Sequence, residues 1–349
     1  MKAEIREKSK AFRRMIDEAG SIAVIGHVHP DGDCIGSTLA VYNYICDNFK
    51  AKTVDVYTEE FSVDFMFLEG ADKIHHEPVE RKQVYDLAIS IDVSDMDRLG
   101  RFIDVYKSAI STVCIDHHVS NPGFGDMCYV VPDASSACEA LTDLIDMDKV
   151  SIRTANCLYL GIIHDTGVFK YSCTGPKTMD IAGMLIAKGV NTEYIIDETF
   201  YKKTYKQNLL MARTLLESNL YDDGRIIVGY ITRDMFNSFK CTTMDTDGIV
   251  EQLRLTEGTE VAIFAYQITK KKTKFSLRAK GNVDVSKLAA HFGGGGHVKA
   301  AGFETTSSYN KVLKQLISMI EEQMGIVPEA PAKKSSTKKA SVTKTTTKK

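Results

Sequence analysis

Short apolar runs alternate with amphipathic segments through the first half of the chain. The runs are rich in Ile and Val, as buried strands are, and they span residues 22–26, 53–58, 86–93 and 112–116. A helical period follows in residues 36–49, 136–146 and 152–163, and residues 61–68 suit a short helix. Because strands that alternate with helices form parallel sheets, this half is predicted to be an α/β domain with helices on both faces of a parallel sheet.

The pattern changes after a helical stretch in the middle of the chain. Residues 176–220 have helical periodicity, and the part from 194 to 220 is long enough for a helix that links two domains. Beyond it, the pattern predicts strands at 225–231, 260–268 and 273–280 and helices at 247–255, 285–291 and 309–323. We therefore predict a first domain at 1–185, a helical linker at 186–223, a smaller α/β domain at 224–325 and a tail at 326–349, with a cleft between the two domains.

Composition places the chain among ordinary globular proteins. Its 349 residues are 44% hydrophobic and 26% charged, and no apolar run approaches the ~20 residues that span a bilayer. The charged N-terminus lacks the apolar stretch of a signal peptide. None of the eight cysteines forms a Cys-x-x-Cys pair, so most are expected to be small core residues, and only Cys34 lies beside a chemical motif. A cytoplasmic protein without membrane contact is expected.

The C-terminal segment has a different character from the rest of the chain. Residues 331–349 carry seven lysines and no acid, so a net charge of −2 leaves the rest of the chain at −9. A segment of Lys, Ser, Thr and Ala without periodicity is expected to be disordered. Two interpretations stay open for it, a solubilising tail or weak non-specific attraction to nucleic acid.

Five short motifs carry most of the histidines and many acids. Seven of the nine histidines lie in or beside them. The motifs are His27-Val-His29-Pro-Asp31-Gly-Asp33, Ile91-Asp92-Val93-Ser94-Asp95, Asp116-His117-His118, His164-Asp165-Thr166-Gly167 and Gly293-Gly294-Gly295-Gly296-His297. Three of them begin where a predicted strand stops, after Ile25, Ile91 and Ile115. Ligands of open α/β sheets bind outside the carboxyl ends of strands, so these motifs are expected to converge at one edge.

Imidazole and carboxylate gathered in this way predict a site for divalent metals. Pro30 and Gly32 favour a loop from which Asp31 and Asp33 point to different places, as two separate ions would require. Asp92 can bridge two ions because a carboxylate has two oxygens. Mixed nitrogen and oxygen ligands suit manganese, cobalt, iron or zinc better than calcium. Two ions about 3.5–4 Å apart would suit hydrolysis at phosphorus.

These motifs resemble those of the DHH phosphoesterase family, which is named for the triplet at 116–118. The second domain resembles the DHHA1 module of that family, through Phe275-Ser-Leu-Arg278 and through Phe292-Gly-Gly-Gly-Gly-His-Val-Lys-Ala-Ala-Gly302. Within the family, the layout is similar to that of bifunctional oligoribonucleases that also dephosphorylate 3′-phosphoadenosine 5′-phosphate. The resemblance covers almost the whole chain except the tail.

The resemblance implies roles for individual residues. It implies one manganese ion on His27, Asp31 and Asp92, and a second on Asp33, Asp92, His117 and Asp165. It implies that His118 faces the scissile phosphate, and that Asp116 orients a ligand histidine from behind. Catalysis would then depend on His118, Asp92 and Asp116.

Some residues are open to a structural and a functional interpretation. His29 is expected to be a wall residue rather than a ligand, and His164 is open between packing and support of the site. Arg98 resembles a recurrent family arginine and is a candidate for substrate binding, yet an ion pair with Asp95 or Asp97 is slightly favoured for it. The glycines can be a hinge or, through successive free N–H groups, an anion nest. The resemblance favours substrate binding by Gly294, Gly295, Gly296, His297 and Arg278.

The leading expectation is a dinuclear-metal phosphohydrolase. The resemblance implies short RNA oligonucleotides of about two to five nucleotides as substrates, 5′-mononucleotides as products, and 3′-phosphoadenosine 5′-phosphate as a second substrate. Two Mn²⁺ ions are the expected cofactors, although other divalent metals also fit, and a homodimer is compatible with the resemblance. The alternatives are a phosphodiesterase for linear or cyclic dinucleotides such as pApA, a non-catalytic nucleotide- or RNA-binding protein, and a structural metalloprotein.

Overall fold

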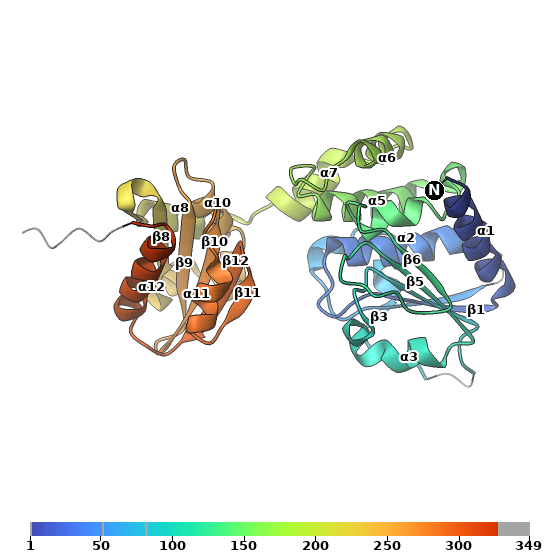
Figure 1. Ribbon diagram of the computed structural model, residues 1–349, viewed down its shortest axis with the longest axis horizontal. Coiled ribbons are helices and arrows are strands. Elements are labelled where there is room, and N and C mark those ends of the chain that lie inside the picture. Colours follow the sequence, from blue (N-terminus) through green and yellow to red (C-terminus); the bar gives the residue numbers. More distant parts are fainter. Residues whose placement is uncertain (1, 51, 81–82, 327–349) are drawn as a thin grey trace, which may run out of the picture. The chain divides into compact units, whose positions relative to one another are not determined.

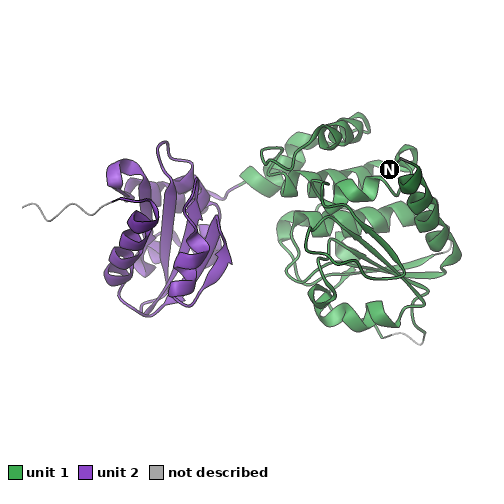
Figure 2. Ribbon diagram, viewed as in Figure 1, with its two compact units in different colours: residues 1–202 green, residues 203–349 purple. Residues whose placement is uncertain are grey.

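The protein forms two compact units, which are residues 1–202 and 203–349 (Figure 2). The structure is a computed structural model that describes residues 2–50, 52–80 and 83–326. The tail predicted at 326–349 lies almost entirely outside the described residues. In the described part of the chain, no helix combines the length and the apolar character needed to cross a membrane.

The first unit is built on a six-stranded parallel sheet with the strand order β3-β2-β1-β4-β5-β6 (Figure 1). The strands are β1 (Ser21–Ile25), β2 (Thr53–Tyr57), β3 (Ile74–His75), β4 (Leu87–Ile91), β5 (Ser111–Asp116) and β6 (Met127–Val130). β1, β4 and β5 lie at the centre of the sheet and are neighbours. The predicted parallel sheet is therefore confirmed, and the three strands that carry motifs at their ends lie side by side.

Helices cover both faces of this sheet, as predicted. They are α1 (Lys2–Glu18), α2 (Gly32–Asn48), α3 (Ile103–Ser108), α4 (Ala137–Thr142), α5 (Ile152–Asp165), α6 (Pro176–Ala187) and α7 (Thr192–Ile196). Short helical turns are η1 (Val63–Phe65), η2 (Ala71–Lys73), η3 (Met96–Phe102) and η4 (Met147–Lys149). α2 and α5 lie together on one face, and α3 lies on the other (Figure 1).

Alternation along β1 shows why both faces need a cover. Ile22 and Val24 join the core under α2 and α5, whereas Ala23 and Ile25 join the core under η3 and α3. All four side chains are fully buried. Burying an Ile side chain contributes about 1.5–3 kcal/mol, so a strand of this composition is stable only between two helical layers.

Two sequence expectations about helices were wrong. The helix expected at 36–49 begins at Gly32, because the Asp31 carboxylate caps it by accepting from the N–H groups of Asp33 and Cys34. Asp33 therefore lies in the first helical turn and not in a loop. The segment 194–220 is not one helix: α7 continues as a π-helical turn, η5 (Asp197–Tyr201), and α8 (Tyr205–Leu216) begins only after the Thr204 cap.

The second unit contains a six-stranded mixed sheet with the order β11-β12-β10-β9-β8-β7. The strands are β7 (Asn219–Tyr221), β8 (Ile226–Ile231), β9 (Val261–Thr269), β10 (Lys272–Ala279), β11 (Gly295–His297) and β12 (Ala300–Thr305). The helices are α8, α9 (Arg233–Phe239), α10 (Ile249–Arg254), α11 (Val285–His291) and α12 (Tyr309–Gln323), with short turns η6 (Asp222–Gly224) and η7 (Thr243–Thr246). β9 and β10 match the strands predicted at 260–268 and 273–280, and they pair as an antiparallel hairpin with a lysine-rich turn.

The two faces of this second sheet differ. α11 and α12 cover one face, where Phe275 and Leu277 of β10 are fully buried. α8, α9 and α10 cover the other face over β8 and β9. On that second face the alternate β10 residues Lys274, Ser276 and Arg278 are only half-buried. A polar strip along β10 therefore stays accessible beside α10.

Candidate metal centre

Three neighbouring strands bring three motifs to one edge of the first sheet. Ile91, the last residue of β4, pairs with Ile115 of β5, and Ile25 of β1 pairs with Ser90. The chain turns sharply after β4: Asp92 has a left-handed φ of 59°, and its N–H donates to the Ile115 carbonyl at 3.0 Å. Asp tolerates this backbone region better than most residues. The turn leaves the Asp92 side chain between the ends of β1 and β5.

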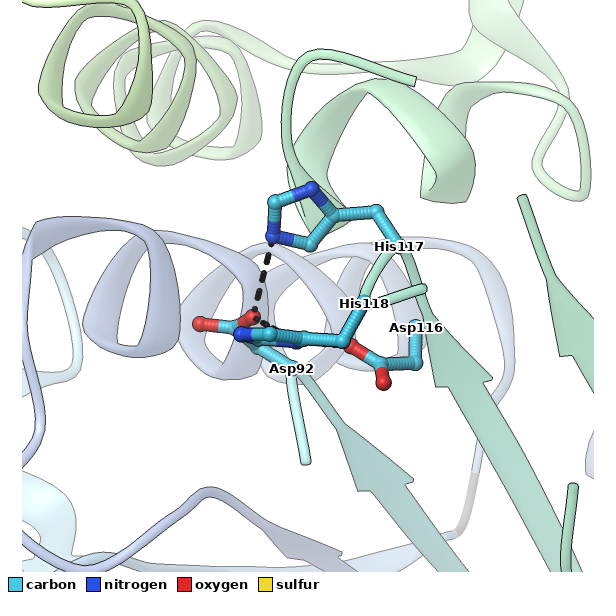
Figure 3. A group of neighbouring side chains, drawn as sticks. All are labelled: Asp92, Asp116, His117 and His118. Carbon is cyan, nitrogen blue, oxygen red and sulfur yellow. Dashed lines mark hydrogen bonds and ion pairs between the residues drawn. The ribbon is translucent and has the colours of Figure 1, made fainter. Parts of the chain in front are cut away.

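Asp92 lies between two imidazole rings. Its Oδ2 is 3.5 Å from His27 Nε2, and its Oδ1 is 3.5 Å from His117 Nε2. Figure 3 shows the second of these contacts, with His118 Nδ1 also 3.7 Å from Asp92 Oδ1. The Asp92 side chain is 3% exposed. Each of its oxygens therefore faces a different histidine, as a bridging ligand requires.

The two acids of the first motif face different histidines. Asp31 Oδ1 is 3.8 Å from His27 Nε2, and the Asp31 side chain is 59% exposed. Asp33 is fully buried, and its Oδ2 is 3.9 Å from His117 Nε2. The Asp33 carboxylate also accepts from the N–H groups of Ala137 and Cys138 at the start of α4. These two bonds hold Asp33 in position by using the first turn of a second helix.

Asp165, at the end of α5, completes the second group of ligands. Its Oδ2 is 3.1 Å from His117 Nε2. The opposite ring nitrogen, His117 Nδ1, lies 3.4 Å from the Ala134 carbonyl, so the proton of a neutral ring belongs on Nδ1 and Nε2 is left to face the acids. All six predicted ligands thus form one chain of contacts, with His27 and Asp31 on one side of Asp92 and Asp33, His117 and Asp165 on the other.

The gathered charges shift the acid–base properties of these groups. Burial disfavours a charged imidazole, but Asp165 and Asp92 outweigh burial and raise the pKa of His117 to about 12. Burial likewise opposes the charge on His27, yet Asp31 and Asp92 raise its pKa far above the usual range. The pKa of Asp33 rises because the group is buried and lies near Asp92 and Asp165. So many acids at one place need positive charge to offset their repulsion.

Divalent cations fit this requirement. Asp92 Oδ1 is buried and has no hydrogen-bond partner among the described residues, so it retains lone pairs for an ion. The donor atoms of Asp33, His117 and Asp165 lie within 4.8 Å of one another, and so do those of Asp92, Asp116, His117 and His118. Mixed imidazole and carboxylate donors suit manganese and related transition metals. The residues present therefore fit a metal centre with Asp92 at its middle.

Asp116 supports His118 rather than the ligand His117, which corrects the expectation from the sequence. Asp116 Oδ1 is 2.8 Å from His118 Nδ1 (Figure 3). Asp116 Oδ2 accepts from Asn121 Nδ2 at 2.7 Å. Asn121 also donates to the Val93 carbonyl at 2.9 Å. Asn121 was not predicted from the sequence, where its only signal is that it is a polar residue shortly after the histidine pair. His118 is 42% exposed, so an accessible histidine is held by a buried carboxylate.

Arg98 reaches the metal centre, and the ion pair with Asp95 or Asp97 that the sequence favoured is absent from the described residues. Its guanidinium Nη2 lies 3.1 Å from His27 Nδ1. The same His27 nitrogen lies 2.8 Å from the Val28 carbonyl. Only one of these contacts can involve a protonated Nδ1, and the shorter distance favours donation to Val28. Asp95 has a different role, because it caps η3 through the N–H groups of Asp97 and Arg98.

The other residues beside the motifs lie outside the ligand groups or pack against them. His29 is 90% exposed and its Nδ1 lies 3.6 Å from Glu59 Oε2. His164 packs against the rings of Phe65 and Phe200, and burial lowers its pKa to about 4. Cys34 is buried, accepts from the His27 N–H, and its sulfur forms a third close group with His27 and Asp92. His164 therefore packs as a neutral ring.

In the second unit, three of the predicted substrate residues share one face of the mixed sheet, namely Gly295, His297 and Arg278, whereas Gly296 pairs with Ala301 on the opposite face and Gly294 precedes β11. Gly295 pairs with Gly302, which pairs with Ser276, while His297 pairs with Ala300, which pairs with Arg278. Residues that are paired across neighbouring strands point to the same face. Arg278, Ser276, Gly302, Gly295 and His297 thus share the face that α11 and α12 leave uncovered.

The glycines form structure rather than an open anion nest. The N–H groups of Gly293 and Gly294 donate to the Ala290 and Ala289 carbonyls and so end α11, and Gly295 begins strand β11. A Cβ on Gly294 would lie 2.2 Å from the Gly302 oxygen. A Cβ on Gly296, where φ is +143°, would lie 2.5 Å from the Ala300 oxygen. These two positions need glycine because another backbone passes too close.

Comparison with known proteins finds one family domain in each of the two compact units. A model of the DHH family N-terminal domain matches residues 21–162, and a model of the DHHA1 domain matches residues 223–325. A crystal structure of an exopolyphosphatase-related protein from Bacteroides fragilis is similar in fold, with a TM-score of 0.78 at 24% identity over 91% of this chain and 96% of that chain.

Two curated relatives match most of the chain. The bifunctional oligoribonuclease and PAP phosphatase NrnA of Thermus thermophilus is 28% identical over 84% of this chain and 89% of its own length. A probable NrnA of Streptococcus mutans is 30% identical over 85% of this chain and 94% of its own length. With both family domains present in order and relatives of this similarity over nearly their full length, the chain belongs to the DHH family of phosphoesterases that carry a DHHA1 domain.

Proposed function

We propose that the protein is a two-metal phosphohydrolase that degrades short oligoribonucleotides, of about two to five nucleotides, to 5′-mononucleotides. The same centre would convert 3′-phosphoadenosine 5′-phosphate to AMP. The observation that carries the proposal is the position of Asp92, which presents one oxygen to His27 and the other to His117. The NrnA relatives from T. thermophilus and S. mutans support the choice of substrate.

Each protein group has a part in this reaction. His27, Asp31 and Asp92 would hold one ion, and Asp33, Asp92, His117 and Asp165 the other, with Mn²⁺ the expected metal. Bound divalent ions supply Lewis acidity at the phosphoryl oxygens and make water acidic enough to give hydroxide near neutral pH. His118 is held through Nδ1 by Asp116, so its Nε2 is the atom available to contact a phosphoryl oxygen or the leaving group.

The DHHA1 domain would bind the nucleotide. Arg278 and His297 supply a cation and a hydrogen-bonding ring on one sheet face. Gly295 and Gly302 add no side chains to that face, so a ligand can approach the backbone closely. A domain that binds one terminal nucleotide would favour short substrates over long ones. Rapid cleavage of long structured RNA would contradict this part of the proposal.

Two other functions remain as competitors within the same test. A phosphodiesterase for pApA or cyclic di-AMP would use the same metal ligands and differ only in the shape of substrate accepted. A non-catalytic RNA-binding protein would bind without turnover. The six gathered ligands argue against the second competitor, because binding alone does not require a buried carboxylate between two imidazoles.

The first experiment is a turnover assay with the full chain. A 5′-labelled RNA dinucleotide and an RNA of about 24 nucleotides are incubated with Mn²⁺, with chelator, and with Asp92→Asn protein. Mn²⁺-dependent release of mononucleotide from the dinucleotide, lost in the variant, supports the proposal. Parallel reactions with 3′-phosphoadenosine 5′-phosphate, pApA and cyclic di-AMP rank the substrates. Folded, metal-loaded protein that cleaves neither RNA would rule out the nuclease proposal.

A further inference from the structure

A carboxylate on α10 joins two arginines beside the accessible strip of β10. Glu251 Oε1 accepts from Arg278 Nε at 2.6 Å, and Glu251 Oε2 accepts from Arg254 Nε at 2.7 Å. The two arginine side chains are 29% and 22% exposed, and Glu251 is 42% exposed. One acid therefore positions two cations, and the group keeps a net positive charge.

Some guanidinium N–H donors of Arg254 and Arg278 have no acceptor among the described residues. Arg278 is further fixed because its Nη1 donates to the Leu277 carbonyl at 3.1 Å. Among the described residues, Arg278 Nη2 and both Nη groups of Arg254 have no acceptor. Since Glu251 contacts each guanidinium through its Nε, the free donors belong to the Nη groups, which are the atoms that bind a second anion in a fork.

A second arginine–glutamate pair in the same unit lacks the extra arginine found beside Glu251. Arg225 Nε donates to Glu260 Oε1 at 2.7 Å, and both side chains are 38% exposed. That pair is one cation with one anion, so it is neutral. The group on α10 has a second arginine, and its Arg278 shares a sheet face with His297 and Gly295.

The ionised state of Glu251 fits this arrangement. Burial opposes its charge, but the bonds from Arg254 and Arg278 outweigh burial and hold the pKa of Glu251 below its usual range. Glu251 is therefore a carboxylate at neutral pH, and its two oxygens remain acceptors for both arginines.

We propose that Glu251 is a positioning residue that holds Arg254 and Arg278 as a guanidinium pair for the terminal 5′-phosphate of a nucleotide. Arg254 then contacts substrate directly and is a further specificity residue of the DHHA1 domain. A phosphate monoester carries up to two negative charges and three acceptor oxygens, which suits two arginines better than one. The inference rests on the proposed function for its class of substrate.

The test compares a dinucleotide with and without a 5′-phosphate, pApA and ApA, on the full metal-loaded protein. Arg254→Ala is expected to raise KM for pApA about tenfold, to leave kcat within about twofold, and to leave KM for ApA unchanged. Arg254→Lys is expected to lie between, because it keeps the charge and loses the fork. Glu251→Gln is expected to resemble Arg254→Ala, Glu251→Asp to recover part of the preference, and Arg225→Ala to behave as the wild type.

Equal losses on pApA and ApA, or an unchanged preference for pApA in Arg254→Ala, would overturn the inference. A binding measurement separates it from the proposed function. Calorimetry with AMP and adenosine on the full chain in chelator reports the DHHA1 domain without turnover. If the wild type hydrolyses neither dinucleotide but binds AMP more tightly than adenosine, and Arg254→Ala loses that difference, the arginine pair stands and the nuclease proposal fails. Equal binding of AMP and adenosine by the wild type refutes the pair.

Discussion

The two units of this protein differ in the charged groups that they bring together and in how far those groups are buried. In the first unit, acids and histidines are buried at the end of three strands, where Asp33 and Asp92 are almost inaccessible. In the second unit, Arg254, Glu251 and Arg278 stay partly exposed at the border of a sheet face lined with small residues. Buried acids of like charge repel one another, and bound cations offset that repulsion. An exposed cationic pair can bind and release an anion repeatedly. This difference is the one expected between a site for a resident ion, as proposed for the first unit, and a site for a transient substrate, as proposed for the second.

The largest expected effect comes from the middle of the metal centre. Asp92→Asn keeps the side-chain shape and the left-handed turn but removes the charge between His27 and His117. Activity on the dinucleotide should fall by ~10³-fold or more, because both ions lose a shared ligand. Metal content measured by mass spectrometry should fall with it. A variant that keeps its full metal content and rate would contradict the bridging role and would make the two regions more alike than we infer.

The next effect concerns the support of His118. Asp116→Asn replaces one acceptor oxygen by an NH2 donor, so His118 Nδ1 and Asn121 Nδ2 can no longer both donate to residue 116. The negative charge beside His118 is also lost, so kcat should fall about 100-fold with KM little changed. Asp126→Asn is the matched control, because Asp126 also accepts hydrogen bonds at β5, from Thr112 at the opposite end of the strand. If both variants lose activity equally, the loss reflects strand stability and not the orientation of His118.

A third prediction contrasts two neighbouring glycines of the second unit. Gly294→Ala places a methyl group 2.2 Å from the Gly302 oxygen, whereas a Cβ on Gly295 meets nothing within 4 Å. Gly294→Ala should lower the free energy of unfolding of this unit by about 1–3 kcal/mol, and Gly295→Ala by much less. Thermal unfolding of both proteins measures the difference. Similar melting temperatures would show that the glycines serve ligand binding alone.

The smallest predicted effect lies at Arg98. Its guanidinium packs 3.1 Å from His27 Nδ1, whose proton goes to the Val28 carbonyl, and neighbours that hold a ligand from behind change metal affinity by about tenfold. Arg98→Ala should therefore weaken Mn²⁺ binding by about that factor in a titration monitored by electron paramagnetic resonance. Arg101→Ala, three residues further on, removes an arginine that pairs with Glu59 and Glu77 and should leave the affinity unchanged. A larger loss with Arg101→Ala would place the important arginine elsewhere.

Much of the first unit could be predicted because its strands and motifs are local patterns. Ile25, Ile91 and Ile115 end apolar runs, so the edge at which the motifs meet followed from alternation alone. The start of α2 could not be predicted in this way, because the residues around Asp31 fit a helix cap and a loop equally well. The partner of Asp116 was also hidden, since only the turn after β5 decides which of two consecutive histidines it contacts.

The second unit was harder to predict in detail. Its hairpin at β9 and β10 was evident, but β12 is a run of Ala, Gly and Phe without strong alternation. The glycine run resembled a flexible loop, whereas close approach to Gly302 and Ala300 explains two of its members. Glu251 belongs to none of the motifs recognised in the sequence. Its importance depends on Arg254, one helical turn away, and on Arg278, which is 27 residues distant along the chain.

The left-handed backbone at Asp92 has a consequence for protein design and for the drift of sequences. Two independent demands meet at this position: the backbone tolerates Asp, Asn or Gly, and the ions need a carboxylate, which Asp or Glu supplies. Asp alone meets both. Anyone who transplants this centre onto another parallel sheet must copy the turn together with the ligand. A lineage that abandons catalysis can replace Asp92 by Asn at little cost to the fold, which makes this position a sensitive marker of lost activity.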